Sequence, residues 1–327
     1  MDRTTRPYRF SLALIAILLM FPAAAAFGEI FACAGDSIRV FADDAGLGST
    51  PIRTIAGPTS GVAQCYGIAL DNLHNELWVT SQTTVRVFDA RANGDIAPLR
   101  TITGFGIATG VAVDVEADEV FVGTGSALIA VYPRTATGSP APLRTLHGDG
   151  AVVGLFVDRV NDKLYVESYA GDDTIGNVVV FKRQADGEWA YFGVLGSFPA
   201  PFGLVVDAHG KEVFVATGPG YGTVEVYDLK GHALRTIGGS SSLLTRSAGL
   251  SLLQNGTLLT GNQYESATTP DAIFGYMRMQ NGDVAPTVQI NLATPPAHAL
   301  WGIASTHAFE CGEGNTTSYC LFRSSFE

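Results

Sequence analysis

An eight-residue segment recurs four times in this chain of 327 residues. It reads APLRTITG at residues 97–104, and close copies stand at 50–57, 141–148 and 232–239. Repetition at such intervals indicates a supersecondary unit that cannot bury its apolar face alone and must stack against copies of itself. The repeat therefore constrains the fold more strongly than the composition does.

Each copy belongs to a regular series of short β-type segments. The first segment holds a Gly, an apolar run and often a final Asp; its copies are 66–71, 110–114, 153–158, 202–207, 248–253 and 301–305. A second series stands at 76–81, 119–125, 163–169, 212–218 and 256–262, and a third at 84–90, 128–134, 177–183, 223–229 and 272–278. The repeated motif is the fourth segment, and its weakest versions are 189–196 and 284–291. The segments are rich in β-branched and aromatic residues and are separated by turn residues, which predicts strands and hairpins.

The polarity of these segments predicts how deeply each strand is buried. The first and second strands are apolar at almost every position, so we expect them to be buried on both faces. The third strands alternate apolar and polar residues, which predicts one wetter face.

The spacing of the first segments indicates the architecture. Their glycines are Gly67, Gly110, Gly154, Gly203, Gly249 and Gly302, at spacings of 43, 44, 49, 46 and 53 residues. A period of about 40–50 residues with four strands is typical of one β-propeller blade. The sequence therefore predicts an all-β, six-bladed β-propeller with four antiparallel strands per blade.

The two ends of the chain complete the count of blades. Residues 29–35, 37–43 and 50–57 supply a second, third and fourth strand without a first, and 301–305 supply a first strand alone. We expect one C-terminal strand and three N-terminal strands to form the last blade. Such closure ties the ring and removes exposed sheet edges.

These residues resemble the NHL and YncE-like six-bladed propeller proteins over about residues 29–305. The resemblance depends on the recurring GIA-x-D, E-x-[WF]-V and V-x-VF patterns and on the Arg-Thr-Ile-Gly end of each blade. It implies the propeller architecture and specifies no activity. The tail 320–327, CLFRSSFE, is also similar to the endings of some exported bacterial proteins.

The N-terminal segment has the pattern of a secretory signal. Arg3, Arg6 and Arg9 precede the apolar run 10–21, and small residues at 22–26 offer a cleavage site. We expect residues 1–26 to be a signal peptide, 27–309 the propeller and 310–327 a C-terminal tail, so the protein is exported to the periplasm or secreted. A retained anchor and a lipid-modified Cys33 are the alternatives.

The charge of the chain bears on its partners. Formal net charge is −11, and removal of three Arg and one Asp with residues 1–26 leaves −13. Sequence-independent nucleic-acid binding depends on basic groups, so we expect no nucleic-acid partner. No other apolar run approaches the length of a membrane span, so we expect none in the mature chain.

The four cysteines of the mature chain predict disulfides. Cys311 and Cys320 flank a short loop, which favours that pair and leaves Cys33 with Cys65. A zinc site is the alternative on cysteine count alone, but CxxC spacing is absent.

Three residue types recur in the blades for structural reasons. Asp71, Asp114, Asp158 and Asp207 end first strands, and we expect them to hold the following turns, on the side of the ring opposite a ligand site. We expect Arg53, Arg100, Arg144 and Arg235 on outer strands to be solvated or paired with a neighbouring blade's carboxylate. The glycines of the first strands should permit close packing near the axis.

Two regions are candidates for binding. The residues before the marker glycines are Tyr66, Thr109, Val153, Phe202, Ala248 and Trp301, a mainly apolar ring that would suit either a ligand at the mouth of the central channel or a plugged core. The loops 169–176, 218–222 and 262–271 form a second region on adjacent blades. They carry Tyr169, Tyr221 and Tyr264, which we expect to project from a raised rim as contact residues.

Metal ligands are sparse in the predicted axial positions. Glu167 is the one charged residue among the predicted ends of the second strands, and Asp172 and Asp173 lie in a loop without calcium-loop spacing. These three residues are weak metal candidates. We predict no cofactor, although calcium is possible. We name no catalytic residue.

The leading hypothesis is an exported binding or protein-interaction module that acts through its top-face loops on an unknown protein or small ligand, and an enzyme is less favoured. The alternative is a metal-dependent propeller hydrolase or lyase, similar to lactonases, with its site at the channel mouth. A third reading is a redox or sugar-binding propeller with a bound cofactor.

Overall fold

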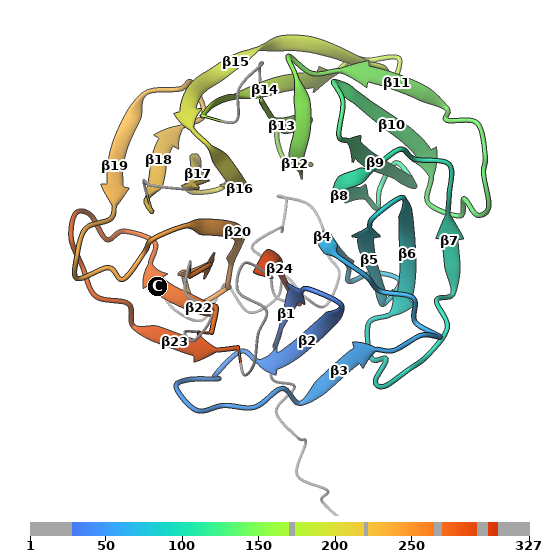
Figure 1. The fold of residues 1–327 in the computed structure, drawn as a ribbon. Helices are drawn as coiled ribbons and strands as arrows, with labels where there is room; N and C mark the ends of the chain where they lie inside the picture. Colours follow the sequence, from blue (N-terminus) through green and yellow to red (C-terminus); the bar gives the residue numbers. More distant parts are fainter. Residues whose placement is uncertain (1–27, 170–173, 219–221, 265–269, 293–299, 307–327) are drawn as a thin grey trace, which may run out of the picture.

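The computed structural model describes residues 28–169, 174–218, 222–264, 270–292 and 300–306, and these residues form six four-stranded sheets arranged in a ring (Figure 1). Blade 1 contains β4 (Cys65–Asp71), β5 (Glu76–Ser81), β6 (Thr84–Asp89) and β7 (Arg100–Ile102), and blade 2 contains β8 (Ala108–Asp114), β9 (Glu119–Thr124), β10 (Leu128–Pro133) and β11 (Arg144–His147). Blade 3 contains β12 (Ala151–Asp158), β13 (Lys163–Tyr169), β14 (Ile175–Arg183) and β15 (Trp189–Pro199). Blade 4 contains β16 (Pro201–Asp207), β17 (Glu212–Thr217), β18 (Val224–Asp228) and β19 (Ala233–Ile237), and blade 5 contains β20 (Ser247–Leu252), β21 (Thr257–Asn262), β22 (Ala272–Met277) and β23 (Val288–Asn291). The prediction of a six-bladed all-β propeller is confirmed.

The sixth sheet, here called the closing blade, joins both ends of the described chain. It contains β24 (Leu300–Ser305), β1 (Glu29–Ala34), β2 (Ser37–Ala42) and β3 (Arg53–Ala56), in that order. β24 pairs antiparallel with β1, and the register places Ile303 opposite Ala32. The ring is therefore closed by one C-terminal strand and three N-terminal strands, as the sequence predicts.

A disulfide joins the closing blade to blade 1. Cys33 in β1 bonds Cys65 at the start of β4, with the two Cα atoms 5.5 Å apart. The predicted pair Cys33–Cys65 is thus confirmed. The other predicted pair, Cys311 and Cys320, the predicted signal peptide 1–26 and the predicted tail 310–327 lie outside the described residues. No helix in the described part of the chain is long and apolar enough to cross a membrane.

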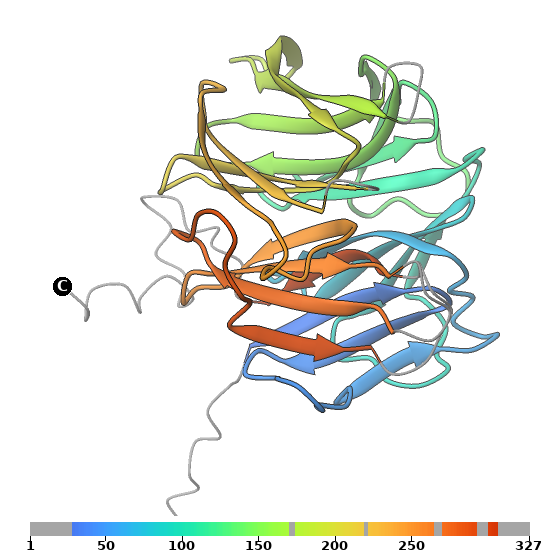
Figure 2. The ribbon, with the colours of Figure 1, turned by 60° about the vertical axis from the view of Figure 1, so that its left-hand side comes forward.

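Within each blade, the first strand lies nearest the axis and the fourth lies at the rim (Figures 1 and 2). The second strands are buried as expected, since every residue of β5 and β17 is buried. The first strands vary: every residue of β20 is buried as expected, whereas the middle five residues of β4 are partly exposed. β4 is the edge of its sheet that borders the axis, and neighbouring blades cover both of its faces: Ile68 and Leu70 pack in the core shared with the closing blade, and Ala69 packs in the core shared with blade 2. The main apolar cores lie between neighbouring blades, as where Val205 and Phe214 of blade 4 pack with Tyr276 of blade 5.

The glycine of each first strand permits close approach around the axis, as predicted. A Cβ atom added at Gly67, Gly110, Gly203 or Gly249 would lie 2.7–3.2 Å from the Cα of the corresponding glycine in the next blade. Real Cβ atoms rarely have neighbours so close, so side chains there would force the blades apart. At Gly154 the added atom would instead meet the Glu167 carboxylate. Glu167 therefore occupies the seam between blades 3 and 4.

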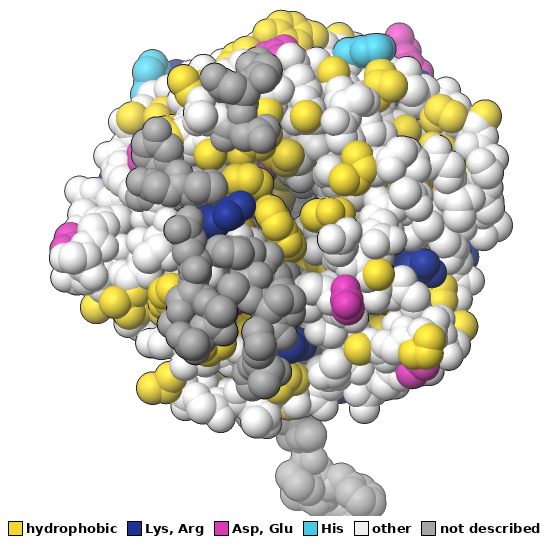
Figure 3. All heavy atoms as spheres, in the orientation of Figure 1, with side chains coloured by type: hydrophobic (Ala, Val, Ile, Leu, Met, Phe, Trp, Pro, Cys, Tyr) yellow, Lys and Arg dark blue, Asp and Glu magenta, His cyan; other side chains and the backbone are white. Residues whose placement is uncertain are grey.

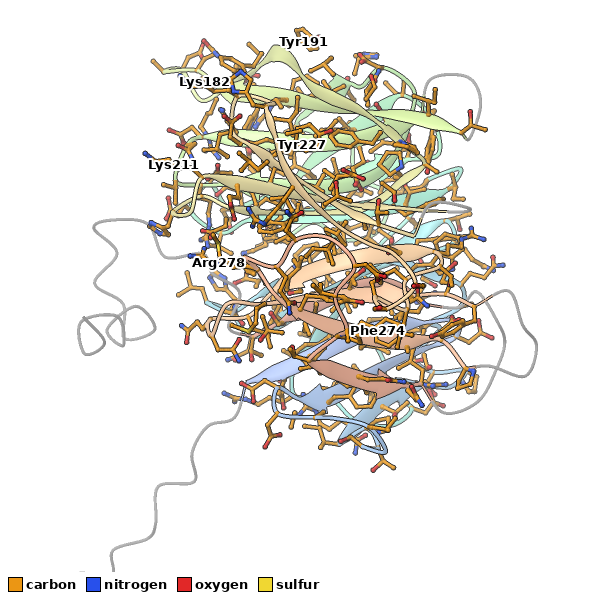
Figure 4. The ribbon with its side chains drawn as sticks, turned by 90° about the vertical axis from the view of Figure 1, so that its left-hand side faces the viewer. Lys182, Tyr191, Lys211, Tyr227, Phe274 and Arg278 are labelled. Carbon is orange, nitrogen blue, oxygen red and sulfur yellow. A yellow bond between two sulfur atoms is a disulfide. The ribbon has the colours of Figure 1, made fainter. Side chains whose placement is uncertain are left out.

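The repeated Asp residues hold the turns between first and second strands, as predicted. Asp71 Oδ1 accepts hydrogen bonds from the backbone N–H groups of Leu73 and His74, both at 3.0 Å. Asp207 also pairs with Arg278, the residue that follows the third strand of the next blade. In the side view of Figure 4, Arg278 lies on the left-hand side, away from the side on which the first strands begin. This is the side of the ring that the sequence analysis assigned to the Asp residues.

The repeated Arg residues were expected to pair with a neighbouring blade's carboxylate, and among them only Arg144 has such a contact in the described structure, with Glu188 of blade 3 at 3.7 Å; the main partner of each Arg is another residue. Each pairs with the Glu that begins the second strand of its own blade; the pairs are Arg53–Glu29, Arg100–Glu76, Arg144–Glu119 and Arg235–Glu212. The neighbouring blade contributes a backbone carbonyl instead, such as that of Arg134, which accepts from Arg100 Nη2 at 3.3 Å. The reason is register: Arg100 lies opposite Val87, so its side chain reaches across β6 to β5 on one face of the same sheet.

Candidate functional site at the axis

Four aromatic side chains meet on the face of the ring where the first strands begin. Their ring centroids are 5.9 Å apart for Tyr66 and Trp301, 5.8 Å for Phe202 and Trp301, and 5.7 Å for Tyr169 and Phe202. We call these four residues the axial aromatic cluster. Spacings of this size are typical of favourable edge-to-face and tilted ring contacts.

The aromatic side chains come from separate blades, and the repeat explains how they reach each other. Tyr66, Phe202 and Trp301 each precede the marker glycine of a first strand, in β4, β16 and β24. Between Phe202 and Trp301 the equivalent residue is Ala248 of blade 5, which is small and buried. The absence of a large side chain at that position leaves room for the two rings to touch across it.

Tyr66, Phe202 and Trp301 are only partly buried. Figure 3 views this face of the ring, and hydrophobic side chains gather around its centre with a basic side chain beside them. The other two predicted members of the apolar ring, Thr109 and Val153, are small and also partly exposed. The large rings are therefore concentrated on one side of the axis.

Arg246 lies over the axial aromatic cluster. Its guanidinium carbon is 5.6 Å from the Phe202 ring centroid and 5.7 Å from that of Trp301. The backbone of Arg246 is held in place, because its carbonyl accepts a hydrogen bond from Gln263 N at 3.0 Å and its N–H donates to Asn262 Oδ1 at 3.3 Å. Among the described residues, no Asp or Glu lies within ion-pair distance of its guanidinium.

Sequence reasoning missed Arg246. Two features of the sequence could have identified it. Arg246 lies two residues before Ala248, at the predicted mouth of the central channel, and it stands outside the outer-strand motif to which the repeated arginines belong. Gln263, also missed, supports Trp301 from below: its Nε2 donates to the carbonyl of Leu300 at 2.6 Å. Gln263 Oε1 is buried, and no described residue forms a hydrogen bond with it.

The predicted rim of three tyrosines is not formed in the expected way. Tyr169 does not project from a loop; it ends β13, is only 5% exposed, and donates from its hydroxyl to the Pro201 carbonyl at 3.0 Å. Its place is beneath Phe202, because its ring completes the packing between blades 3 and 4. Tyr264 is partly buried and packs against the core between blades 4 and 5. Tyr221 lies outside the described residues.

Glu167 lies one strand outward from the axis, within the wall of the ring. It pairs in register with Gly154, and its Oε1 accepts a hydrogen bond from Gly203 N, the residue after Phe202, at 3.1 Å. Its side chain is fully buried, and Oε2 has no hydrogen-bond partner among the residues that the structure describes. Burial raises the pKa of the Glu167 carboxyl to about 8, against an opposing effect of the Gly203 hydrogen bond. Near neutral pH most molecules therefore carry it protonated.

The three metal candidates from the sequence, Glu167, Asp172 and Asp173, form no metal site within the described part of the chain. Within the described residues, no group of three or more His, Cys, Asp or Glu side chains is arranged to hold a metal ion. Glu167 therefore belongs to no such group among the described residues, while Asp172 and Asp173 fall outside the described part.

Comparisons with known proteins show the fold. The chain matches no family model and no curated protein. Among solved structures it resembles a chain of a nidogen/laminin complex, with a TM-score of 0.62 and 14% identity, covering 87% of this chain and all of that one. It also resembles the WD40 β-propeller domain of Doa1 (TM-score 0.52, 15% identity, 81% and 80% of the two chains) and a protein of unknown function from Desulfotomaculum acetoxidans DSM 771 (TM-score 0.54, 14% identity, 86% and 99%). These similarities support the propeller architecture, and none identifies the NHL or YncE-like family.

Proposed function

We propose that this chain is an exported binding protein that holds a ligand or protein partner at the axial aromatic cluster. The observation that carries the proposal is the meeting of Tyr66, Phe202 and Trp301, three partly exposed aromatic side chains from three blades, at one point on the axis. Aromatic side chains offer large contact areas with few rotatable bonds, which makes them frequent anchors of binding sites. Propellers also serve protein interactions, and one similar structure is a complex of nidogen with laminin.

Export is part of the proposal. The signal-like segment 1–26 supports it. The Cys33–Cys65 disulfide is compatible with an oxidising compartment outside the cytoplasm. The binding residues are Tyr66, Phe202 and Trp301 at the axis. The predicted rim of tyrosines is not used, because Tyr169 is buried beneath Phe202.

Tryptophan fluorescence provides the test. Trp78 and Trp189 are buried, so a ligand at the axis should change mainly the emission of Trp301. We expect fractions of the periplasm or culture medium to contain a component that changes this emission in the full chain. The purified component should then bind the Tyr66→Ala and Phe202→Ala variants at least about tenfold more weakly by calorimetry, since burying an aromatic ring contributes more than 1.4 kcal/mol.

The control is Tyr191→Ala. Tyr191 is 59% exposed on the outer strand β15 and lies at the periphery in Figure 4. Its removal should leave binding unchanged. Equal affinity of the Phe202→Ala and Tyr191→Ala variants would show that the partner binds elsewhere.

A further inference from the structure

Arg246 differs from the repeated arginines of the blades in its surroundings. Arg53, Arg100, Arg144 and Arg235 each have a glutamate partner, whereas the described chain offers Arg246 only the faces of Phe202 and Trp301. A guanidinium that stacks on aromatic rings uses its flat face and keeps its N–H donors, which lie in its plane, available. These donors match the two oxygens of a carboxylate.

The charge around Arg246 is consistent with an anionic ligand. The chain carries a net charge of −11, so a guanidinium at the axis without a carboxylate partner among the described residues is a local exception. Glu167 at the neighbouring seam is bonded to Gly203 N and is largely protonated near neutral pH, so it contributes little negative charge there.

We propose that the axial aromatic cluster and Arg246 together bind a small organic carboxylate with an apolar or aromatic body. The Arg246 guanidinium binds the carboxylate, and the exposed parts of Tyr66, Phe202 and Trp301 contact the apolar body. This inference rests on the proposed binding function and specifies its ligand class. The alternatives are a neutral aromatic ligand, which needs no guanidinium, and an organic cation, which the Arg246 charge would repel.

Three probes of nearly equal size separate these classes: para-fluorophenylacetate, para-fluorophenylacetamide and para-fluorophenethylamine, followed by fluorine NMR with the full chain. We expect the carboxylate to bind at least about tenfold more tightly than the amide, since charge-assisted hydrogen bonds contribute about 1.5–3 kcal/mol. The amine should bind more weakly than both. Added salt should reduce the preference, because the attraction is partly electrostatic.

Substitution of Arg246 assigns the preference to this residue. Arg246→Gln should abolish the preference for the carboxylate over the amide, and Arg246→Lys should retain part of it. Arg91→Gln removes the same charge from an exposed position after β6 and should change nothing. Thermal melting of each variant confirms that it is folded.

Equal affinity for carboxylate and amide, preference for the amine, or no binding of any probe at millimolar concentration would each overturn the inference. So would an unchanged preference in Arg246→Gln. The fluorescence test with natural fractions depends on no charge preference, so the proposed function stands or fails separately from this ligand class.

Discussion

Glu167 is the residue whose behaviour depends most on its place in the ring. Five of the six equivalent positions on the second strands hold Thr80, Gly123, Ala216, Gly261 and Cys33, none of them acidic. At the seam between blades 3 and 4, the Glu167 carboxyl instead fills the space between Gly154 and Gly203. A single backbone N–H does not compensate for complete loss of water around a carboxylate, so the protonated form is favoured.

This burial predicts a dependence of stability on pH. Between about pH 4.5 and pH 8, the folded chain keeps the Glu167 proton that the unfolded chain has released. Raising the pH through this window should therefore destabilise the fold by about 1.4 kcal/mol per pH unit from this residue. Urea unfolding at several pH values should show this slope in the natural chain. The slope due to this residue should be absent in the Glu167→Gln variant. Parallel curves for the two proteins would contradict the assignment.

At the scale of the elements, each blade is tied to the next by more than apolar packing. Loops between third and fourth strands lie along the outer strand of the preceding blade, where Gly94 pairs with Ile55, Gly138 with Ile102 and Gly282 with Ile237. These contacts hydrogen-bond part of the outer edge of β3, β7 and β19, which would otherwise be open to pairing with another chain. Ion pairs such as Arg278–Asp207 join blades on the face opposite the axial cluster.

The Cys33–Cys65 disulfide should add stability between the closing blade and blade 1. It closes a loop across 32 positions, for which restriction of the unfolded chain corresponds to about 3–4 kcal/mol. We expect a reductant to lower the free energy of unfolding of the natural chain by roughly this amount, as measured with guanidinium chloride. The Cys33→Ala/Cys65→Ala variant should show only the part of the reductant effect that is due to Cys311 and Cys320. An equal effect of reductant on both proteins would rule out a stabilising role for this disulfide.

At the scale of the whole molecule, stability depends on closure of the ring. Thr306 N donates to the Glu29 carbonyl, and Glu29 N donates to Thr306 Oγ1. These bonds extend the pairing of β1 with β24, so the two ends of the described chain are parts of one sheet. Without β24, the inner edge of β1 would have no partner strand, and apolar residues of β1 would be exposed.

Two shortened chains test the contribution of closure. A chain that ends at Leu292 lacks β24 and should lose its cooperative melting transition and aggregate, as followed by calorimetry and size-exclusion chromatography. A chain that ends at Thr306 keeps β24 and serves as the matched control. Similar cooperative melting of the two shortened chains would show that closure does not stabilise the ring.

The sequence by itself determined the number of blades, the order of strands and the closure, because these follow from a repeated local pattern. Each predicted strand lies within a few residues of an observed one, and even the degraded first strand at 301–305 was found, as β24. Turn-forming Asp71 and the close-packed glycines were also predictable, since their roles depend on backbone within or next to their own repeat.

Only the tertiary structure decided which side chains meet between blades. It paired Arg100 with Glu76 of the same blade, buried Tyr169 beneath Phe202, and placed Arg246 over two rings that are 99 positions apart in the chain. These contacts depend on the rotation of one blade against the next and on the size of side chains such as Ala248 between them. A repeat specifies each blade separately, whereas the candidate site exists only where several blades converge on the axis.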